Sequence, residues 1–182
     1  MTASAPSLAR QTSRRSPVAE APALAAAAAR LAATTLLVTM AFIALAHVAG
    51  GMRFADGSHS AIVDGLHTVT ILLLLPLPFA LHRLLVTASP RASAAAVALA
   101  VDAIVFGAVL HALFALGTIT FDAAGPLLLV GYGAFAGWLW MVGTIGAASG
   151  RLPNGRWMAL LGATVVGLPI WLAWVARRLE PG

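Results

Sequence analysis

The chain contains no cysteine and no lysine, and it has few charged residues of any kind. The absence of cysteine excludes disulfides, thiolate metal sites and iron–sulfur clusters, so a metal would have to bind histidine, carboxylate or methionine side chains. Only 9% of the residues are charged, whereas a soluble globular domain carries about 25%. The composition therefore excludes a soluble globular domain.

Apolar residues make up 60% of the 182 residues, and the mean hydropathy is +0.93. They are grouped in continuous blocks of about 20 residues, the length of a helix that crosses a bilayer. Continuous blocks favour helices over the alternating strands of a membrane barrel. We predict an all-α protein, a bundle of five transmembrane helices, with spans at about 31–50, 61–81, 94–116, 126–147 and 157–176.

Residues 1–29 are rich in Ala, Ser, Pro and Arg and have no apolar period. This composition predicts a disordered cytoplasmic tail ahead of a transmembrane domain over 30–178. With the N-terminus inside, eight arginines lie in cytoplasmic segments and three outside, as the excess of positive charge on the inner side requires. The inner set is Arg10, Arg14, Arg15, Arg30, Arg83, Arg91, Arg151 and Arg156, and the outer set is Arg53, Arg177 and Arg178. Arg177 and Arg178 oppose this orientation, and five spans force them outside.

The pI near 11.6 comes entirely from arginine. Because the arginines flank the apolar blocks, their expected partners are anionic lipid headgroups rather than nucleic acid. The expected location is the bacterial cytoplasmic (inner) membrane.

The most informative residues are three histidines and one aspartate on three consecutive spans. His47, His67 and His111 are all predicted in the outer half of the membrane, and Asp64 lies three residues before His67 on the same helix face. Ionisable residues within a span are costly, and they usually face a partner or a water-filled cavity.

Three interpretations of this constellation remain open. His47, Asp64, His67 and His111 could bind a transition metal, with Asp64 as a ligand or as the hydrogen-bond acceptor of His67, and His67 and His111 could hold a b-type haem. The same residues could instead form a hydrogen-bond network that packs three helices without a cofactor. A third interpretation is a proton relay in a small transporter.

Other features favour packing roles. His82 lies at the inner end of its span with no partner at that depth, so at most one haem fits. Asp102 and His111 are nine residues apart and therefore lie on opposite helix faces. Pro76, Pro78 and Pro169 are expected to kink their helices. The Gly133/Gly137 spacing allows close helix approach, either within the chain or in a homo-oligomer or another membrane subunit.

The closing stretch resembles the last helix of small uncharacterised bacterial multi-pass membrane proteins. The resemblance rests on the Leu152-Pro153 turn, Trp157 at the helix start and Pro169-x-Trp171 near its end, and it implies no activity and no site residues. We find no phosphate-binding loop, nucleophile elbow or hydrolase motif. The sequence favours a small integral membrane protein with a non-enzymatic accessory function.

Overall fold

The fold was analysed in a computed structural model that describes residues 17–48, 61–164 and 167–180. The described residues form helices and no strand. The helices are α1 (Pro17–Val48), α2 (Ala61–Leu72), α3 (Pro76–Leu85), α4 (Pro90–Ala115), α5 (Phe121–Ala148), α6 (Gly155–Gly162) and α7 (Gly167–Leu179). The prediction of an all-α protein is confirmed.

Four stretches of the described chain are long and apolar enough to cross a membrane. They are Pro22–Ala41, Ala61–Leu85, Pro90–Ala115 and Ala123–Ala148. The second consists of α2 and α3, which are separated by a turn at residues 73–75. Pro76 follows this turn and has no N–H to continue the helical hydrogen bonds, so the expected kink is present. The protein is thus a multi-pass membrane protein.

Helix α1 begins much earlier than the sequence suggested. It starts at Pro17, so the expected disordered tail over 1–29 is helical from Pro17 onward. Ala25, Ala26 and Ala29 are buried in the bundle. The prediction missed this because alanine carries no apolar period, although it has the highest helix propensity and lets helices approach closely. Residues 1–16 lie outside the described part of the chain.

The fifth expected span, 157–176, is not one helix. It is divided into α6 and α7, with Leu168 N–H bonded to the Thr164 carbonyl and Gly167 N–H bonded to the Thr164 hydroxyl at the bend. Eight residues of α6 reach only about 12 Å at 1.5 Å per residue, far short of the roughly 30 Å of hydrocarbon. Pro169 near the start of α7 cannot donate the hydrogen bond that would continue α6.

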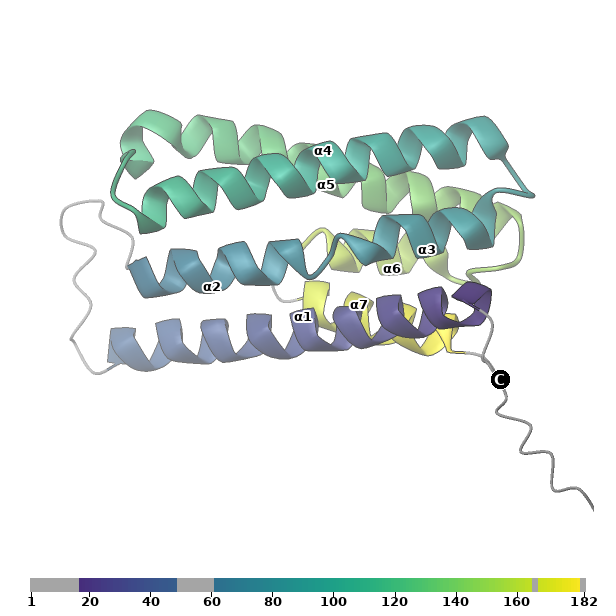
Figure 1. Ribbon diagram of the computed structural model, residues 1–182, viewed down its shortest axis with the longest axis horizontal. Coiled ribbons are helices and arrows are strands. Elements are labelled where there is room, and N and C mark those ends of the chain that lie inside the picture. The colour runs from purple at the N-terminus through teal and green to yellow at the C-terminus, as the bar shows by residue number, and fades with distance from the viewer. Residues whose placement is uncertain (1–16, 49–60, 165–166, 181–182) are drawn as a thin grey trace, which may run out of the picture.

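Helices α6 and α7 form a hairpin that enters and leaves the bundle at the same end (Figure 1). Helix α6 packs against α5, and α7 packs against α1. The N-terminal end of α1 and the C-terminal ends of α3, α5 and α7 lie together at this end of the bundle. We call it the basic end, because it carries Arg83, Arg91, Arg151, Arg156, Arg177 and Arg178. The expected separation of Arg177 and Arg178 from the other arginines is therefore wrong.

Glycines allow the hairpin to pack this tightly. A Cβ added to Gly143 in α5 would lie 2.5 Å from the carbonyl oxygen of Gly155 in α6, and one added to Gly146 would lie 2.6 Å from Leu152. At the bend, a Cβ on Gly162 would lie 2.7 Å from the Trp171 ring. A larger residue at Gly143 or Gly146 would push the hairpin away from α5, and one at Gly162 would separate α6 from α7.

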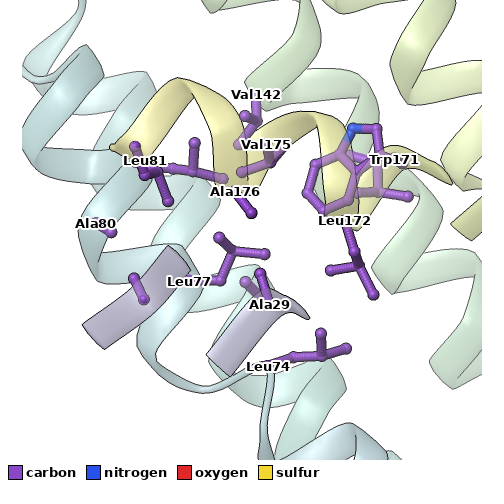
Figure 2. Packing of buried hydrophobic residues seen from close by; sticks show 14 of the residues in the cluster. Ala29, Leu74, Leu77, Ala80, Leu81, Val142, Trp171, Leu172, Val175 and Ala176 are labelled. Atoms are coloured by element: carbon purple, nitrogen blue, oxygen red, sulfur yellow. The ribbon is translucent and has the colours of Figure 1, made fainter. Parts of the chain in front are cut away.

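The main core lies between α1, α3, α5 and α7. Leu77 and Leu81 of α3 contact a cluster that includes Ala29 of α1 and Leu172 and Val175 of α7 (Figure 2). Small residues on α1 face large ones on α7, so their surfaces interdigitate at close helix separation. The hairpin thus fills the half of the bundle nearest the basic end and leaves the opposite half to α1, α2, α4 and α5.

Candidate metal site

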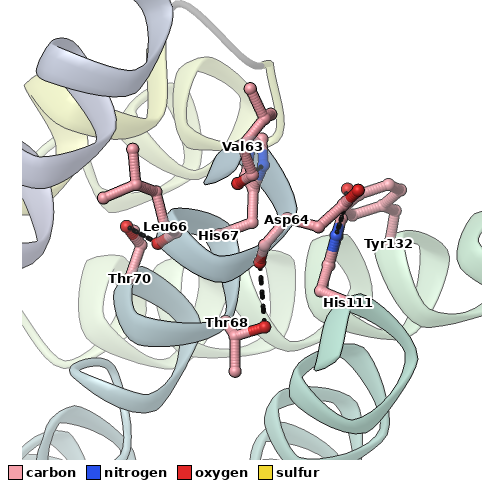
Figure 3. A network of polar contacts seen from close by, with 8 residues as sticks. All are labelled: Val63, Asp64, Leu66, His67, Thr68, Thr70, His111 and Tyr132. Carbon is pink, nitrogen blue, oxygen red and sulfur yellow. Dashed lines mark hydrogen bonds and ion pairs between the residues drawn. The ribbon is translucent and has the colours of Figure 1, made fainter. Parts of the chain in front are cut away.

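Asp64, His67 and His111 meet at the end of the bundle opposite to the basic end. Asp64 lies in the first turn of α2 and His67 in the next turn, while His111 is near the C-terminal end of α4. Helices α2 and α4 pack against each other and run in opposite directions, which brings these ends to the same depth (Figures 1 and 3). We call these three residues the Asp/His cluster.

The centre of the cluster is a buried pair. Asp64 is 0% exposed and His111 is 2% exposed. The His111 Nδ1 atom lies 2.9 Å from the Asp64 Oδ1 atom. A carboxylate accepts hydrogen bonds, so His111 donates from Nδ1 and its Nε2 atom carries the lone pair. A charge-assisted hydrogen bond of this kind offsets part of the cost of burying a carboxylate.

Tyr132 of α5 extends the pair into a chain of three groups. Its hydroxyl oxygen lies 3.2 Å from His111 Nε2, and with the proton of His111 on Nδ1 the tyrosine donates its O–H (Figure 3). The sequence analysis missed Tyr132. It could have been noticed because it is the only tyrosine in the chain and follows Pro126 by six residues, which puts it at the depth of His111.

His67 is oriented differently from the sequence expectation. Its Nδ1 atom lies 3.0 Å from the Val63 carbonyl oxygen, one turn earlier in α2. A carbonyl only accepts, so Nδ1 is the donor and Nε2 holds the lone pair. Asp64 therefore bonds to His111 of another helix rather than to His67. The His67 and His111 rings are stacked, with centroids 4.9 Å apart and planes inclined by 22°.

This arrangement fits a single metal ion. One ligand atom each from Asp64, His67 and His111 lies within 4.8 Å of the others. Two ligands of one zinc ion are separated by at most about 4.2 Å, twice a bond of about 2.1 Å, so only small side-chain movements are needed. His67 donates Nδ1–H to the Val63 carbonyl, the arrangement that usually orients a metal-binding imidazole. His111 Nε2 would have to exchange the Tyr132 hydroxyl for the ion.

A haem between His67 and His111 does not fit. Two axial haem ligands each point one ring nitrogen at the iron from opposite faces of the macrocycle. The His67 and His111 rings instead lie face to face, with centroids 4.9 Å apart. The haem expectation for His67 and His111 therefore finds no support in their arrangement.

The other sequence candidates lie elsewhere. His47 is in the last turn of α1, but its side chain lies outside the described residues. His82 bonds through Nδ1 to the Ser93 hydroxyl near the basic end, away from the cluster. Asp102 lies on the exposed surface of α4, on a different face from the buried His111.

The two glycines considered for an oligomer interface differ in their surroundings. A Cβ on Gly137 would make an ordinary 3.7 Å contact with Leu99 of α4, whereas a Cβ on Gly133 would meet nothing within 4 Å. The closest crossing of α5 within the chain is thus made by Gly143 and not by this pair.

Comparisons with protein-family models, curated proteins and solved structures found no match.

Proposed function

We propose that this protein is an accessory membrane protein that binds one divalent transition-metal ion at the Asp/His cluster. The observation that carries the proposal is the convergence of three ligand atoms from α2 and α4 within 4.8 Å. Two imidazoles and one carboxylate form a ligand set used for zinc and for non-haem iron. The neutral Nε2 of His67 and the carboxylate of Asp64 supply the two ligand types.

The buried position of the cluster strengthens this proposal. Asp64 and His111 are buried and His67 is half-buried within an apolar bundle; ionisable residues in such positions are costly and usually serve function. A divalent ion would neutralise the carboxylate, and the surrounding apolar residues would exclude water from the ion. Loading is expected to fall at low pH, because the ligands must be deprotonated to bind.

The test is metal binding by the purified, chelator-stripped protein in detergent. We expect one Co(II) per chain, with visible absorption bands of a site containing nitrogen and oxygen ligands, and displacement by Zn(II). His67→Ala and His111→Ala should lose binding. His82→Ala is the matched control, because His82 is equally part of the bundle but bonds to Ser93. Sub-stoichiometric cobalt in the wild type, or equal loss in the control, would rule out the site.

A second candidate function is proton transfer, favoured by the Asp64–His111–Tyr132 chain of hydrogen bonds. Intramembrane chains of this kind conduct protons in pumps and transporters. The test is proton flux in metal-free liposomes loaded with a pH-sensitive dye. Flux in the wild type that is lost in Asp64→Asn would support the relay, and the absence of flux would eliminate it.

We further propose that the basic end faces the cytoplasm of a bacterium, with the Asp/His cluster in the outer half of the inner membrane. The support is the excess of arginine at one end of the bundle, which usually marks the cytoplasmic side. The hairpin α6–α7 adds Arg177 and Arg178 to this end. An arginine-only, alanine-rich composition also fits a bacterial genome of high GC content.

A further inference from the structure

A cavity of about 360 Å³ lies beside the Asp/His cluster. It is lined by residues of α1, α2 and α5, by Gly162, Ala163 and Thr164, and by Leu168. Leu36, Leu74 and Phe135 contribute to its largely apolar wall, and Phe135 is near the middle of α5. Its volume is in the range of small-molecule sites, about 300–1,000 Å³. Its largely apolar wall belongs mostly to helices long and apolar enough to cross a membrane, so a ligand would come from the bilayer.

Among the described residues, four polar ones line this wall: His67, Thr70, Tyr132 and Thr164. The two threonines direct their hydroxyl hydrogens to the backbone. Thr70 donates to the Leu66 carbonyl at 2.8 Å, and Thr164 donates to the Leu161 carbonyl at 2.8 Å. Thr164 also accepts from Gly167 N–H. Neither threonine therefore has a hydrogen to offer a ligand.

The donor hydrogens of His67 and Tyr132 are also used within the protein. His67 donates from Nδ1 to the Val63 carbonyl, and Tyr132 donates its O–H to His111 because Asp64 holds the other ring hydrogen of His111. A neutral imidazole has one N–H and a phenol has one O–H. All four polar side chains thus donate their hydrogens to other groups of the protein. Thr70, Thr164 and Tyr132 therefore offer the cavity only lone pairs.

We propose that this cavity binds a lipid-soluble alcohol or phenol, a molecule with an apolar body and a hydroxyl group that donates a hydrogen bond. Tyr132 is the principal acceptor, since its oxygen keeps lone-pair capacity after donating to His111. Ketones and ethers of the same shape should bind with lower affinity. They carry only hydrogen-bond acceptors, and the polar groups that line the cavity offer only acceptors as well. Binding of this ligand does not require a metal ion at the Asp/His cluster, although His67 belongs to both the cluster and the cavity wall.

The test compares 2-naphthol with its methyl ether, 2-methoxynaphthalene. The full chain is reconstituted in nanodiscs and stripped of metal, and binding is measured by equilibrium dialysis, with empty nanodiscs correcting for partition into lipid. We expect naphthol to bind about 10- to 100-fold more tightly than the ether, the ratio expected for one hydrogen bond in an apolar site. Equal binding of the two probes would overturn the proposal.

Three variants locate the binding. Tyr132→Phe keeps the ring, removes the acceptor and should reduce the preference for naphthol to less than about 3-fold, a small remnant of one hydrogen bond. Ala136→Phe, at the cavity wall, should abolish binding of both probes. Val130→Phe, on the exposed surface of the same helix, is the matched control and should bind as the wild type does. Loss of binding in this control, or an unchanged preference in Tyr132→Phe, would contradict the assignment.

The outcome is separable from that of the metal proposal. Naphthol binding by metal-stripped protein supports the cavity even if cobalt does not bind. If cobalt binds but naphthol binds no more tightly than its methyl ether, the cavity proposal is overturned and the metal proposal stands.

Discussion

Asp64 is a fully buried carboxylate within a bundle that has very few charges. Its direct hydrogen bond to His111 links α2 to α4, and Tyr132 links the pair to α5. Asp64 also lies in the first turn of α2, where the helix dipole favours a negative charge. The residue therefore has a structural contribution that would exist without any ion, and a test of function has to separate the two.

Asp64→Asn makes this separation. The amide oxygen of asparagine can still accept from His111 Nδ1, so the helices should remain paired and the melting temperature should change little. The negative charge and the carboxylate ligand are lost, so metal affinity should fall by at least 10- to 100-fold, the range measured for residues that only orient ligands. The measurements are cobalt titration and thermal melting of the same sample. Unchanged cobalt affinity would mean that Asp64 is not part of a metal site.

Asp102 presents the opposite case, an aspartate on the exposed surface of α4 near the middle of the span. A charged side chain at the centre of a membrane helix costs about 2.5–3.5 kcal/mol on insertion scales. If lipid covers this face, Asp102→Leu should raise the free energy of unfolding by about 2–3 kcal/mol, measured by denaturation in lipid bicelles. Ala98→Leu, on the same exposed face, is the control and should change little. Destabilisation by Asp102→Leu would instead indicate that another polypeptide covers the aspartate.

At the scale of elements, the feature that shapes the molecule is the hairpin α6–α7. It is anchored where Gly143 of α5 crosses Gly155 of α6, with backbone atoms in direct contact. Without a hydrophobic drive between helices in lipid, such close packing is a main source of helix association. The Arg151 guanidinium also donates to the Leu84 carbonyl at the end of α3, at 2.8 Å, and fastens the turn before α6.

Two glycine-to-alanine substitutions in α5 should therefore have opposite effects. Gly143→Ala inserts a methyl group against the Gly155 carbonyl and should destabilise the fold by about 1–3 kcal/mol, as overpacking does. Gly133→Ala adds a methyl group in open space and should stabilise α5 by up to about 1 kcal/mol through helix propensity. Denaturation in mixed micelles measures both. A neutral Gly143→Ala would show that α6 does not pack on α5 as described.

For the whole molecule, the hairpin determines at which end of the bundle the C-terminal end of α7 lies. Helix α7 returns to the basic end, and Glu180 just beyond it forms an ion pair with Arg30 of α1. Arg178 also lies over the Trp174 ring, 5.8 Å from its centroid. The C-terminal end of α7 is thus fastened to the same end of the bundle as the N-terminal part of α1.

Reporter fusions test this topology. A fluorescent protein that matures only in the cytoplasm should be bright when fused after Gly182, and alkaline phosphatase at the same position should be inactive. The segment 49–60 connects the C-terminal end of α1 to the N-terminal end of α2, and these two ends lie opposite to the basic end. Alkaline phosphatase fused within 49–60 should therefore be active. An active phosphatase after Gly182 would restore a fifth span and contradict the hairpin.

The sequence alone determined the class of the protein and the approximate limits of the second, third and fourth spans. These follow from the length of apolar runs, which is a local property of the chain and does not depend on partners. It also determined that His67 and His111 lie at similar depth, because depth is set by counting residues along a helix. The break at Pro76 could be predicted for the same reason, since the missing N–H acts on its own helix.

Only the tertiary structure decided which side chains meet. The rotation of each helix about its axis brought Asp64 of α2, His111 of α4 and Tyr132 of α5 together and left Asp102 outside. The hairpin also depended on contacts between distant residues, because Gly143, Gly155, Gly162 and Trp171 must fit together before the segment 157–176 folds back. Apolarity is identical for a helix that crosses and one that turns halfway, so hydropathy could not distinguish them, whereas close packing of small residues did.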